Sequence, residues 1–207
     1  MNGPVSDSMR IQGLTQYHIN WGITLPHLRE MAEEVRHAEL HKHDHSDALP
    51  CNDRQPSTAT LFSACLELWQ DNVRESKLMA LMLMPTHEFT PDLAQLWAEQ
   101  LLTNEIAEHA AMLLYQHLPY AAPLAFRFIA LDDPLQAQLG WAIIGRLLRQ
   151  GSTPDQRGLD ELRDQYQALH ATFLAAQHPS PPSSPHPSPL LPLYHTATNT
   201  MNIISNS

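Results

Sequence analysis

Histidines alternate with other polar residues in one short stretch of the chain. His41, His43 and His45 are separated by Lys42 and Asp44. Alternating histidines can ligate a soft divalent ion. A metal site, however, needs a fixed geometry, usually with ligands from more than one structural element. Because residues 37–56 are mostly polar, they are typical of a solvated loop. We therefore predict a His-rich loop and no metal site, with metal ligation as the alternative interpretation.

Glu105 and Glu108 are the second group of residues that could do chemistry. Residues three apart on a helix lie on the same face, so these two carboxylates are one turn apart on one face. A pair of this kind could form part of a site. It also has an ordinary structural explanation, because acids in the first turn of a helix interact favourably with its dipole by about 0.3–1 kcal/mol. The spacing is compatible with both interpretations.

Composition limits the classes of partner that these residues could serve. The chain of 207 residues has 22 acidic against 12 basic residues and a formal charge of −10, which is not the basic balance typical of nucleic-acid binders. A local basic face would still be compatible with this sum. No apolar run reaches the ~18 residues of a membrane span, and we see no signal peptide. Cys51 and Cys65 do not make a disulfide framework. We expect a cytoplasmic protein without a cofactor and without a membrane partner.

Apolar residues with a helical period predict helices in pairs between residues 59 and 150. The predicted pairs are 59–70 with 73–84, 91–102 with 104–118, and 123–131 with 134–150, and 159–176 begins a fourth pair. Both the first and the second helices recur after about 31 or 32 residues. A fixed period of this order predicts an all-α fold, an α-solenoid of armadillo-type or HEAT-like helix pairs. A plain helical bundle is the alternative.

The sequence predicts one folded domain, residues 1–176, and a tail. Helices at 6–13 and 24–35 are expected to cap the repeats. From residue 177 to 207 there is no Asp, Glu, Lys or Arg, and residues 179–189 are almost all Pro and Ser. Since proline removes backbone donors and this run has no apolar period, we predict that 177–207 is disordered. Its role is either a proline-rich partner-binding segment or none.

Three motifs follow one another between residues 20 and 97. The first is Asn20-Trp21-Gly22-Ile23-Thr24-Leu25-Pro26-His27-Leu28-Arg29-Glu30, which is similar to the amino-terminal "G-(I/V)-x-x-P-x-L-R" motif of the bacterial DNA alkylation repair family. The second joins Leu66-Glu67-Leu68-Trp69 to Val73-Arg74-Glu75-Ser76-Lys77-Leu78-Met79-Ala80 and resembles its "ELW…(I/V)-(R/H)-E-x-(K/R)-x-x-A" repeat. The third is Trp97 after Thr90-Pro91, which matches the helix that follows this repeat in the family. The resemblance covers residues 9–150. It implies a HEAT-like solenoid, and the characterised members are DNA glycosylases that remove cationic alkylated purines from duplex DNA.

The resemblance also implies a site. The family's "W-D-x-x-D" falls on Asn104-Glu105-Ile106-Ala107-Glu108, so Glu105 and Glu108 would be the catalytic acids, while Asn104 replaces the aromatic residue. A carboxylate beside the sugar stabilises the oxocarbenium character that develops as the bond to a cationic purine breaks. The family's DNA-contacting arginine falls near Gln138-Leu139. We predict that DNA would be contacted by basic residues on the second helices, namely Arg74, Lys77, Arg146 and Arg149.

Two functions follow from this reading. The first is recognition of lesions on duplex DNA, with glycosylase-like excision of alkylated purines. The second is a HEAT-like scaffold that keeps the fold without the chemistry and binds protein. The fold signature and the retained acid pair favour the first function, whereas the charge of −10, Asn104 and Leu139 favour the second.

Overall fold

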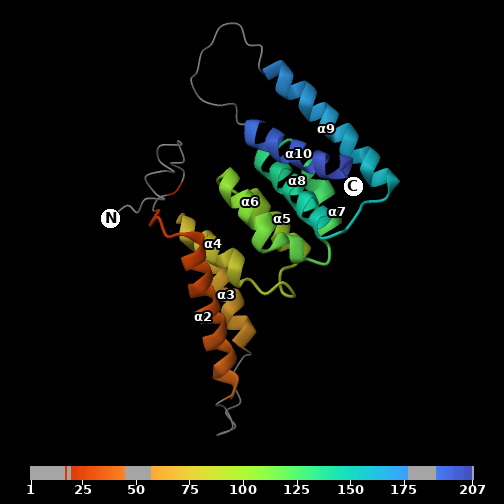
Figure 1. Cartoon of the computed structure of the whole chain (residues 1–207). Helices are drawn as coiled ribbons and strands as arrows, with labels where there is room; N and C mark the ends of the chain where they lie inside the picture. Colours follow the sequence, from red (N-terminus) through yellow and green to blue (C-terminus); the bar gives the residue numbers. More distant parts are fainter. Residues whose placement is uncertain (1–16, 18–19, 45–56, 177–189, 207) are drawn as a thin grey trace. The chain divides into compact units, whose positions relative to one another are not determined.

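The computed structural model describes residue 17 and residues 20–44, 57–176 and 190–206; the predicted helix at 6–13 and the predicted loop from residue 45 to 56 lie outside these. All regular structure in the described residues is helical (Figure 1), which confirms the all-α prediction. The helices are α2 (Leu25–Asp44), α3 (Ser57–Gln70), α4 (Arg74–Leu83), α5 (Pro91–Glu99), α6 (Asn104–Leu113), α7 (Ala121–Ile129), α8 (Pro134–Arg149), α9 (Gln156–Ala176) and α10 (Leu190–Ser205), with a 3₁₀ turn at Tyr115–His117.

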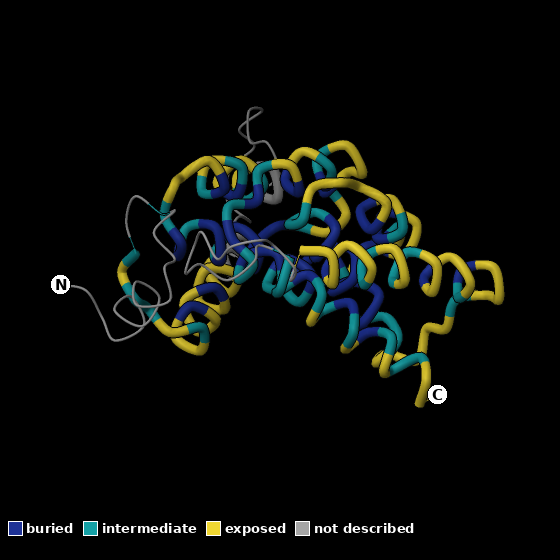
Figure 2. The backbone as a smooth tube through the Cα atoms, turned by 90° about the horizontal axis from the view of Figure 1, so that it is seen from above, coloured by how far each residue is buried: buried dark blue, intermediate teal, exposed yellow. Residues whose placement is uncertain are grey.

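The chain divides into two compact units rather than the single domain predicted for residues 1–176. The first unit is Met1–Thr90 and the second is Pro91–Ser207. The division falls just before α5, which has Pro91 at its first position. Each unit has its own buried apolar residues. Figure 2 marks the buried residues along the backbone in dark blue.

In the first unit, α4 packs against both α2 and α3. Its buried residues lie all round the helix, as the nearly uninterrupted apolar run of its second half predicts. Leu28 of α2, Trp69 of α3 and Leu78 of α4 are each 1% exposed or less. Helix α2 runs on to Asp44, so residues 37–44 are helical. The predicted loop is wrong for that half, because the polar residues continue an existing helix.

In the second unit, α8 is the central helix and packs against α5, α6, α7 and α10. Asp133 caps it by accepting hydrogen bonds from the backbone of Leu135 and Gln136, and Pro134 occupies its first turn. Every residue from 137 to 145 is buried. Gly140 lets α7 come close, since a Cβ there would lie 2.7 Å from the carbonyl oxygen of Ala125.

Helix α10 corrects the prediction that residues 177–207 are disordered. Residues 190–205 form a helix that packs against α8 and α9 (Figure 1), whereas 177–189 lie outside the described residues. Leu193, Ala197 and Thr200 are its buried residues, at positions i, i+4 and i+7. Pro192 is compatible with the helix because it lies in the first turn, where its missing N–H has no helical partner.

Candidate functional site

The carboxylate of Glu108 joins three helices of the second unit. Helix α6 begins after Thr103, whose hydroxyl accepts a hydrogen bond from the backbone N–H of Ile106 at 3.2 Å. Glu108 lies one turn further along. Its Oε1 accepts a hydrogen bond from Gln138 Nε2 of α8 at 3.1 Å and another from Thr196 Oγ1 of α10 at 2.7 Å. We call Glu108, Gln138 and Thr196 the Glu108 seam.

Gln138 is the most buried member of the Glu108 seam. It is 2% exposed, and its Oε1 has no hydrogen-bond partner among the described residues. A buried amide with one unmatched acceptor is less stable than a fully paired one. The bond to Glu108 is therefore the interaction that fixes this amide, and it ties α6 to α8 beneath α10.

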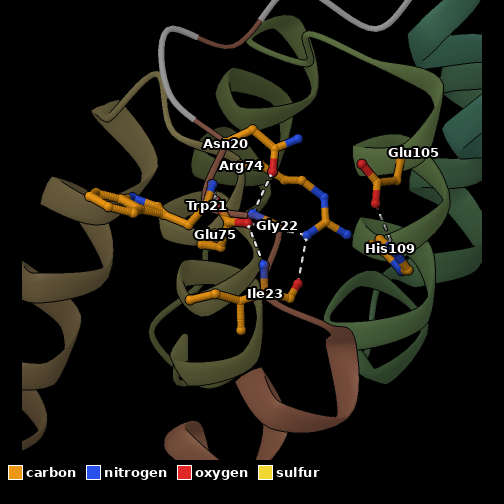
Figure 3. Close-up of polar contacts among 8 residues, drawn as sticks. All are labelled: Asn20, Trp21, Gly22, Ile23, Arg74, Glu75, Glu105 and His109. Atoms are coloured by element: carbon orange, nitrogen blue, oxygen red, sulfur yellow. Dashed lines mark hydrogen bonds and ion pairs between the residues drawn. The ribbon is translucent and has the colours of Figure 1, made fainter. Parts of the chain in front are cut away.

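Glu105 does not share the surroundings of Glu108. Its Oε1 lies 3.7 Å from His109 Nε2, the next turn of the same helix, and both side chains are about one-fifth exposed, 22% and 20%. Figure 3 draws this contact. The predicted acid pair therefore has two different environments: Glu105 is paired within α6, and Glu108 is held by neutral donors from α8 and α10.

Arg74 and Lys77 lie inside the first unit, each 4% exposed. Arg74 Nη1 donates to the carbonyl oxygen of Ile23 at 3.1 Å. Lys77 Nζ donates to the carbonyl oxygen of Trp69 at 2.6 Å and lies 4.5 Å from the centre of its indole ring. Burial lowers the pKa of Lys77, and the charge of Asp71 opposes this shift. Both cations are used within the fold, which corrects the prediction that they reach phosphates.

Glu75 forms a contact that sequence reasoning missed. Its carboxylate accepts hydrogen bonds from two backbone N–H groups, Trp21 to Oε2 at 3.1 Å and Ile23 to Oε1 at 3.2 Å (Figure 3). Gly22 lies between them in the left-handed region, with φ 70°. Its N–H donates to Asn20 Oδ1 at 2.9 Å. The first two motifs of the resemblance are therefore parts of one structural contact.

Arg146 and Arg149 lie in the last turn of α8, where positive charge favours the helix dipole. Arg146 is half-buried and Arg149 is exposed. Of the four predicted DNA contacts, these two are the ones whose side chains reach the surface. They lie two turns beyond Gln138 along α8.

The side chains of His41 and His43, and all of His45, lie outside what the structure describes, so metal ligation by these histidines stays an alternative interpretation. Among the residues searched, no three His, Cys, Asp or Glu side chains are grouped as metal ligands would be. No described helix has both the length and the apolar character to cross a membrane.

In the comparisons with known proteins, no family model, curated protein or solved structure matches the chain.

Proposed function

We propose that this chain is a HEAT-like helical-repeat scaffold, a divergent relative of the DNA alkylation repair enzymes, which binds a protein partner and does not excise bases. The observation that carries the proposal is the burial of Arg74 and Lys77. A DNA-binding surface needs these charges in solvent, and here both donate to backbone carbonyls. The two basic residues of the motif therefore make internal contacts of the first unit.

The packing of the second unit supports the repeat architecture. In a solenoid, equivalent helices of successive pairs lie side by side. Helix α8 contacts both α6 and α10, and the pairs α7–α8 and α9–α10 are each in contact. Second helices α4, α6 and α8 begin at residues 74, 104 and 134, a regular step of 30. On this reading α10 is the second helix of the fourth pair.

The charge of the second unit supports a protein partner. From residue 91 onward the sequence has five arginines and no lysine against ten Asp and Glu residues. Duplex DNA would meet a net negative surface, and counterion release from so few cations would contribute little. A partner with basic side chains fits this charge better.

The Glu108 seam supports the absence of excision. A catalytic carboxylate must face the sugar on which charge develops, but one oxygen of Glu108 already accepts two hydrogen bonds. Asn104, at the first position of α6, offers no ring to stack on a sugar or a base. The acid is therefore well suited to joining α6, α8 and α10, and it lacks the neighbour that excision would use.

Two measurements on the full chain test this proposal. With duplex containing methylated purines, we expect no base release above the spontaneous rate. In affinity capture from extract, we expect protein partners that persist after nuclease treatment. Base release that is lost in Glu108→Gln and kept in the exposed control Glu161→Gln would overturn the proposal. Capture that disappears with nuclease would do the same, since the partner would then be DNA.

Recognition of duplex DNA is the second candidate, and one observation favours it. The resemblance equates Glu108 with the family's second acid and Gln138 with its DNA-contacting arginine. In the structure, Gln138 Nε2 lies 3.1 Å from Glu108 Oε1. Arg146 and Arg149 would then supply the phosphate contacts. The test is the salt dependence of binding to a labelled duplex. Replacing Arg146 and Arg149 with Gln should reduce the slope of log binding constant against log salt concentration by roughly 2. The control variant, Arg157→Gln with Arg163→Gln on α9, should leave this slope unchanged.

A further inference from the structure

A pocket of about 220 Å³ opens to solvent in the second unit, where α7 ends beside α8, α9 and the first turns of α10. Helix α10 contacts both α8 and α9 (Figure 1). Trp141 of α8 and Leu193 of α10 line the pocket and are buried, 1% and 5% exposed, whereas Leu131 lies at its edge and is 40% exposed. The pocket therefore offers an apolar surface to a side chain that enters from solvent.

The end of α7 adds hydrogen-bond acceptors to this surface. The last carbonyl groups of a helix have no partner within the helix. The N–H groups of Ala130 and Leu131 donate to Phe126 and Phe128, but no backbone N–H of the described residues donates to the carbonyl oxygens of Ile129, Ala130 or Leu131. These three residues line the pocket. Because the carboxyl end of a helix carries partial negative charge, this side of the pocket favours a cation with several donors.

The charged side chains around the pocket favour a cation as well. Asp132 lines it and is exposed, whereas the carboxylate of Asp133 caps α8. Arg127 lies in the last turn of α7, but it donates to Gln95 at 3.4 Å and does not line the pocket. Among the described residues that line the pocket there is no Lys, Arg or His. A positive charge from outside would therefore find an acid here and no competing cation.

The size and the acceptors of the pocket select one kind of occupant. A volume of about 220 Å³ lies below the ~300–1,000 Å³ of sites for drug-sized ligands and above the ~150 Å³ that holds one benzene. It suits a single long side chain. Three carbonyl oxygens and the carboxylate of Asp132 are more acceptors than the three donors of a lysine ammonium can reach, whereas a guanidinium has five donors. Arginine also has an apolar stem that can lie on apolar surface.

We propose that this pocket binds an arginine side chain of a protein partner. The stem would lie against Trp141 and Leu193, and the guanidinium would meet Asp132 and the carbonyl groups at the end of α7. The inference rests on the proposed function for the protein nature of the partner, but the binding of a guanidinium concerns the chain alone. None of the three residues of the Glu108 seam lines the pocket, so the two sites are separate.

Titration with N-acetyl-arginine amide tests the site, because this compound presents the side chain as it occurs within a protein. In nuclear magnetic resonance spectra of the full chain, we expect shifts of the amides of Leu131, Asp132 and Leu169, with a dissociation constant on the order of 1 mM. N-acetyl-citrulline amide has nearly the same shape and a neutral ureido group, so it should bind roughly tenfold more weakly. Equal binding of the two compounds would overturn the proposal.

Asp132→Asn tests the charge. Because Asp132 is exposed, we expect the variant to bind N-acetyl-arginine amide roughly three- to fivefold more weakly, as for a partly solvated ion pair. Asp92→Asn is the matched control, since Asp92 is exposed at the start of α5 and does not line the pocket. It should bind like wild type. Equal weakening in both variants would refute the site, because binding would then follow the overall charge.

Ala168→Phe tests the pocket itself. Ala168 and Ala171 are both exposed on α9, but only Ala168 lines the pocket. A phenyl ring at 168 should fill the space and abolish the shifts, whereas Ala171→Phe should bind like wild type. Circular dichroism of both variants should match wild type, which excludes a loss of folding. Undiminished binding by a folded Ala168→Phe would show that the guanidinium binds elsewhere.

Two further outcomes separate the protein side chain from other sources and from the proposed function. Free arginine that binds more tightly than N-acetyl-arginine amide would contradict a protein occupant, because the pocket would then recognise the free amino acid. Nuclease-resistant capture of proteins without any binding of the amide would refute the arginine pocket and leave the proposed function intact. Binding of the amide by a chain that captures no protein would instead overturn the proposed function, while the guanidinium site would stand.

Discussion

The hydroxyl of Thr196 donates a hydrogen bond of 2.7 Å to the carboxylate of Glu108, across 88 residues of sequence. This contact ties the last helix to α6, and Gln138 of α8 shares the same carboxylate oxygen. A residue selected as a catalytic acid is thus part of the packing of three helices. Of its two partners, Gln138 lies where the resemblance places a DNA-contacting arginine, and Thr196 lies outside the residues that the resemblance covers.

Replacing Thr196 with Val should destabilise the second unit by about 1–2 kcal/mol. The substitution keeps the shape of the side chain and removes one of the two donors to a half-buried carboxylate. Urea unfolding followed by circular dichroism would measure the change. Thr172→Val is the matched control, because Thr172 is exposed on α9 and, among the described residues, its hydroxyl bonds only to Ala168 of its own helix. An equal loss in both variants would show that the Glu108 contact contributes nothing.

Replacing Glu75 with Gln should loosen the segment that precedes α2. A carboxylate accepts from both Trp21 and Ile23, whereas an amide has one oxygen and would turn an N–H group toward the other donor. We expect a loss of roughly 1–3 kcal/mol, the range for a hydrogen-bonded charged group. The direct readout is exchange of the Ile23 amide, which should accelerate in Glu75→Gln. The exposed Glu67→Gln on α3 should leave it unchanged.

The helical period gave α3 to α9 with good accuracy because each helix has an apolar face and clear ends. Pro91 and Pro134 begin two of them, and Asp133 caps α8. Helix α10 was missed for a physical reason. It has no charged residue to mark an outer face, it follows a Pro/Ser run, and Pro192 lies in its first turn. Its formation depends on the surface of α8 and α9 rather than on local signals.

The site residues were harder to predict than the helices. Sequence spacing placed Glu105 and Glu108 on one helix face, but it carried no information about Gln138 or Thr196, which lie 30 and 88 residues away from Glu108. Arg74 and Lys77 looked like surface cations because charge usually lies outside. Arg74 and Lys77 instead donate to the backbone carbonyls of Ile23 and Trp69, contacts that depend on how the helices pack and not on local sequence.

The stability of the first unit should fall above pH 9 because of Cys65. Burial raises the pKa of this thiol from 9.0 to about 12, with a smaller lowering by Arg36 and a smaller raising by Glu88. The unfolded chain then loses the proton first, so the thiol's contribution is complete below pH 9 and is lost as the pH rises toward 12. The slope is at most about 1.4 kcal/mol per pH unit.

Cys65→Ala isolates this effect. The variant has its own packing cost, but that cost does not change with pH. The difference in unfolding free energy between wild type and Cys65→Ala should therefore shrink from pH 9 upward, and other titrating groups cancel in the comparison. Unfolding in denaturant at pH 8, 9 and 10.5 would measure it. A difference that stays constant over this range would show that the thiol ionises equally in the folded and unfolded chain.

Two glycines of α8 provide a final matched test of the helix contacts in the second unit. A Cβ on Gly140 would lie 2.7 Å from the Ala125 carbonyl oxygen and 2.9 Å from the Ile129 amide nitrogen, both backbone atoms that cannot turn aside. A Cβ on Gly145 would lie 2.8 Å from the Thr200 hydroxyl, which a side-chain substitution can remove. We expect Gly140→Ala to destabilise the unit by about 1–3 kcal/mol, as overpacking typically does. Gly145→Ala should destabilise the second unit less, and Thr200→Ala should relieve part of that loss.

Because Gly145 and Thr200 touch, the double variant Gly145→Ala/Thr200→Ala should be more stable than the sum of the single changes predicts, by about 0.5 kcal/mol or more. Gly140→Ala combined with Thr200→Ala should be additive, since Gly140 does not contact Thr200. Additivity in both double variants would mean that α10 does not approach α8 at Gly145.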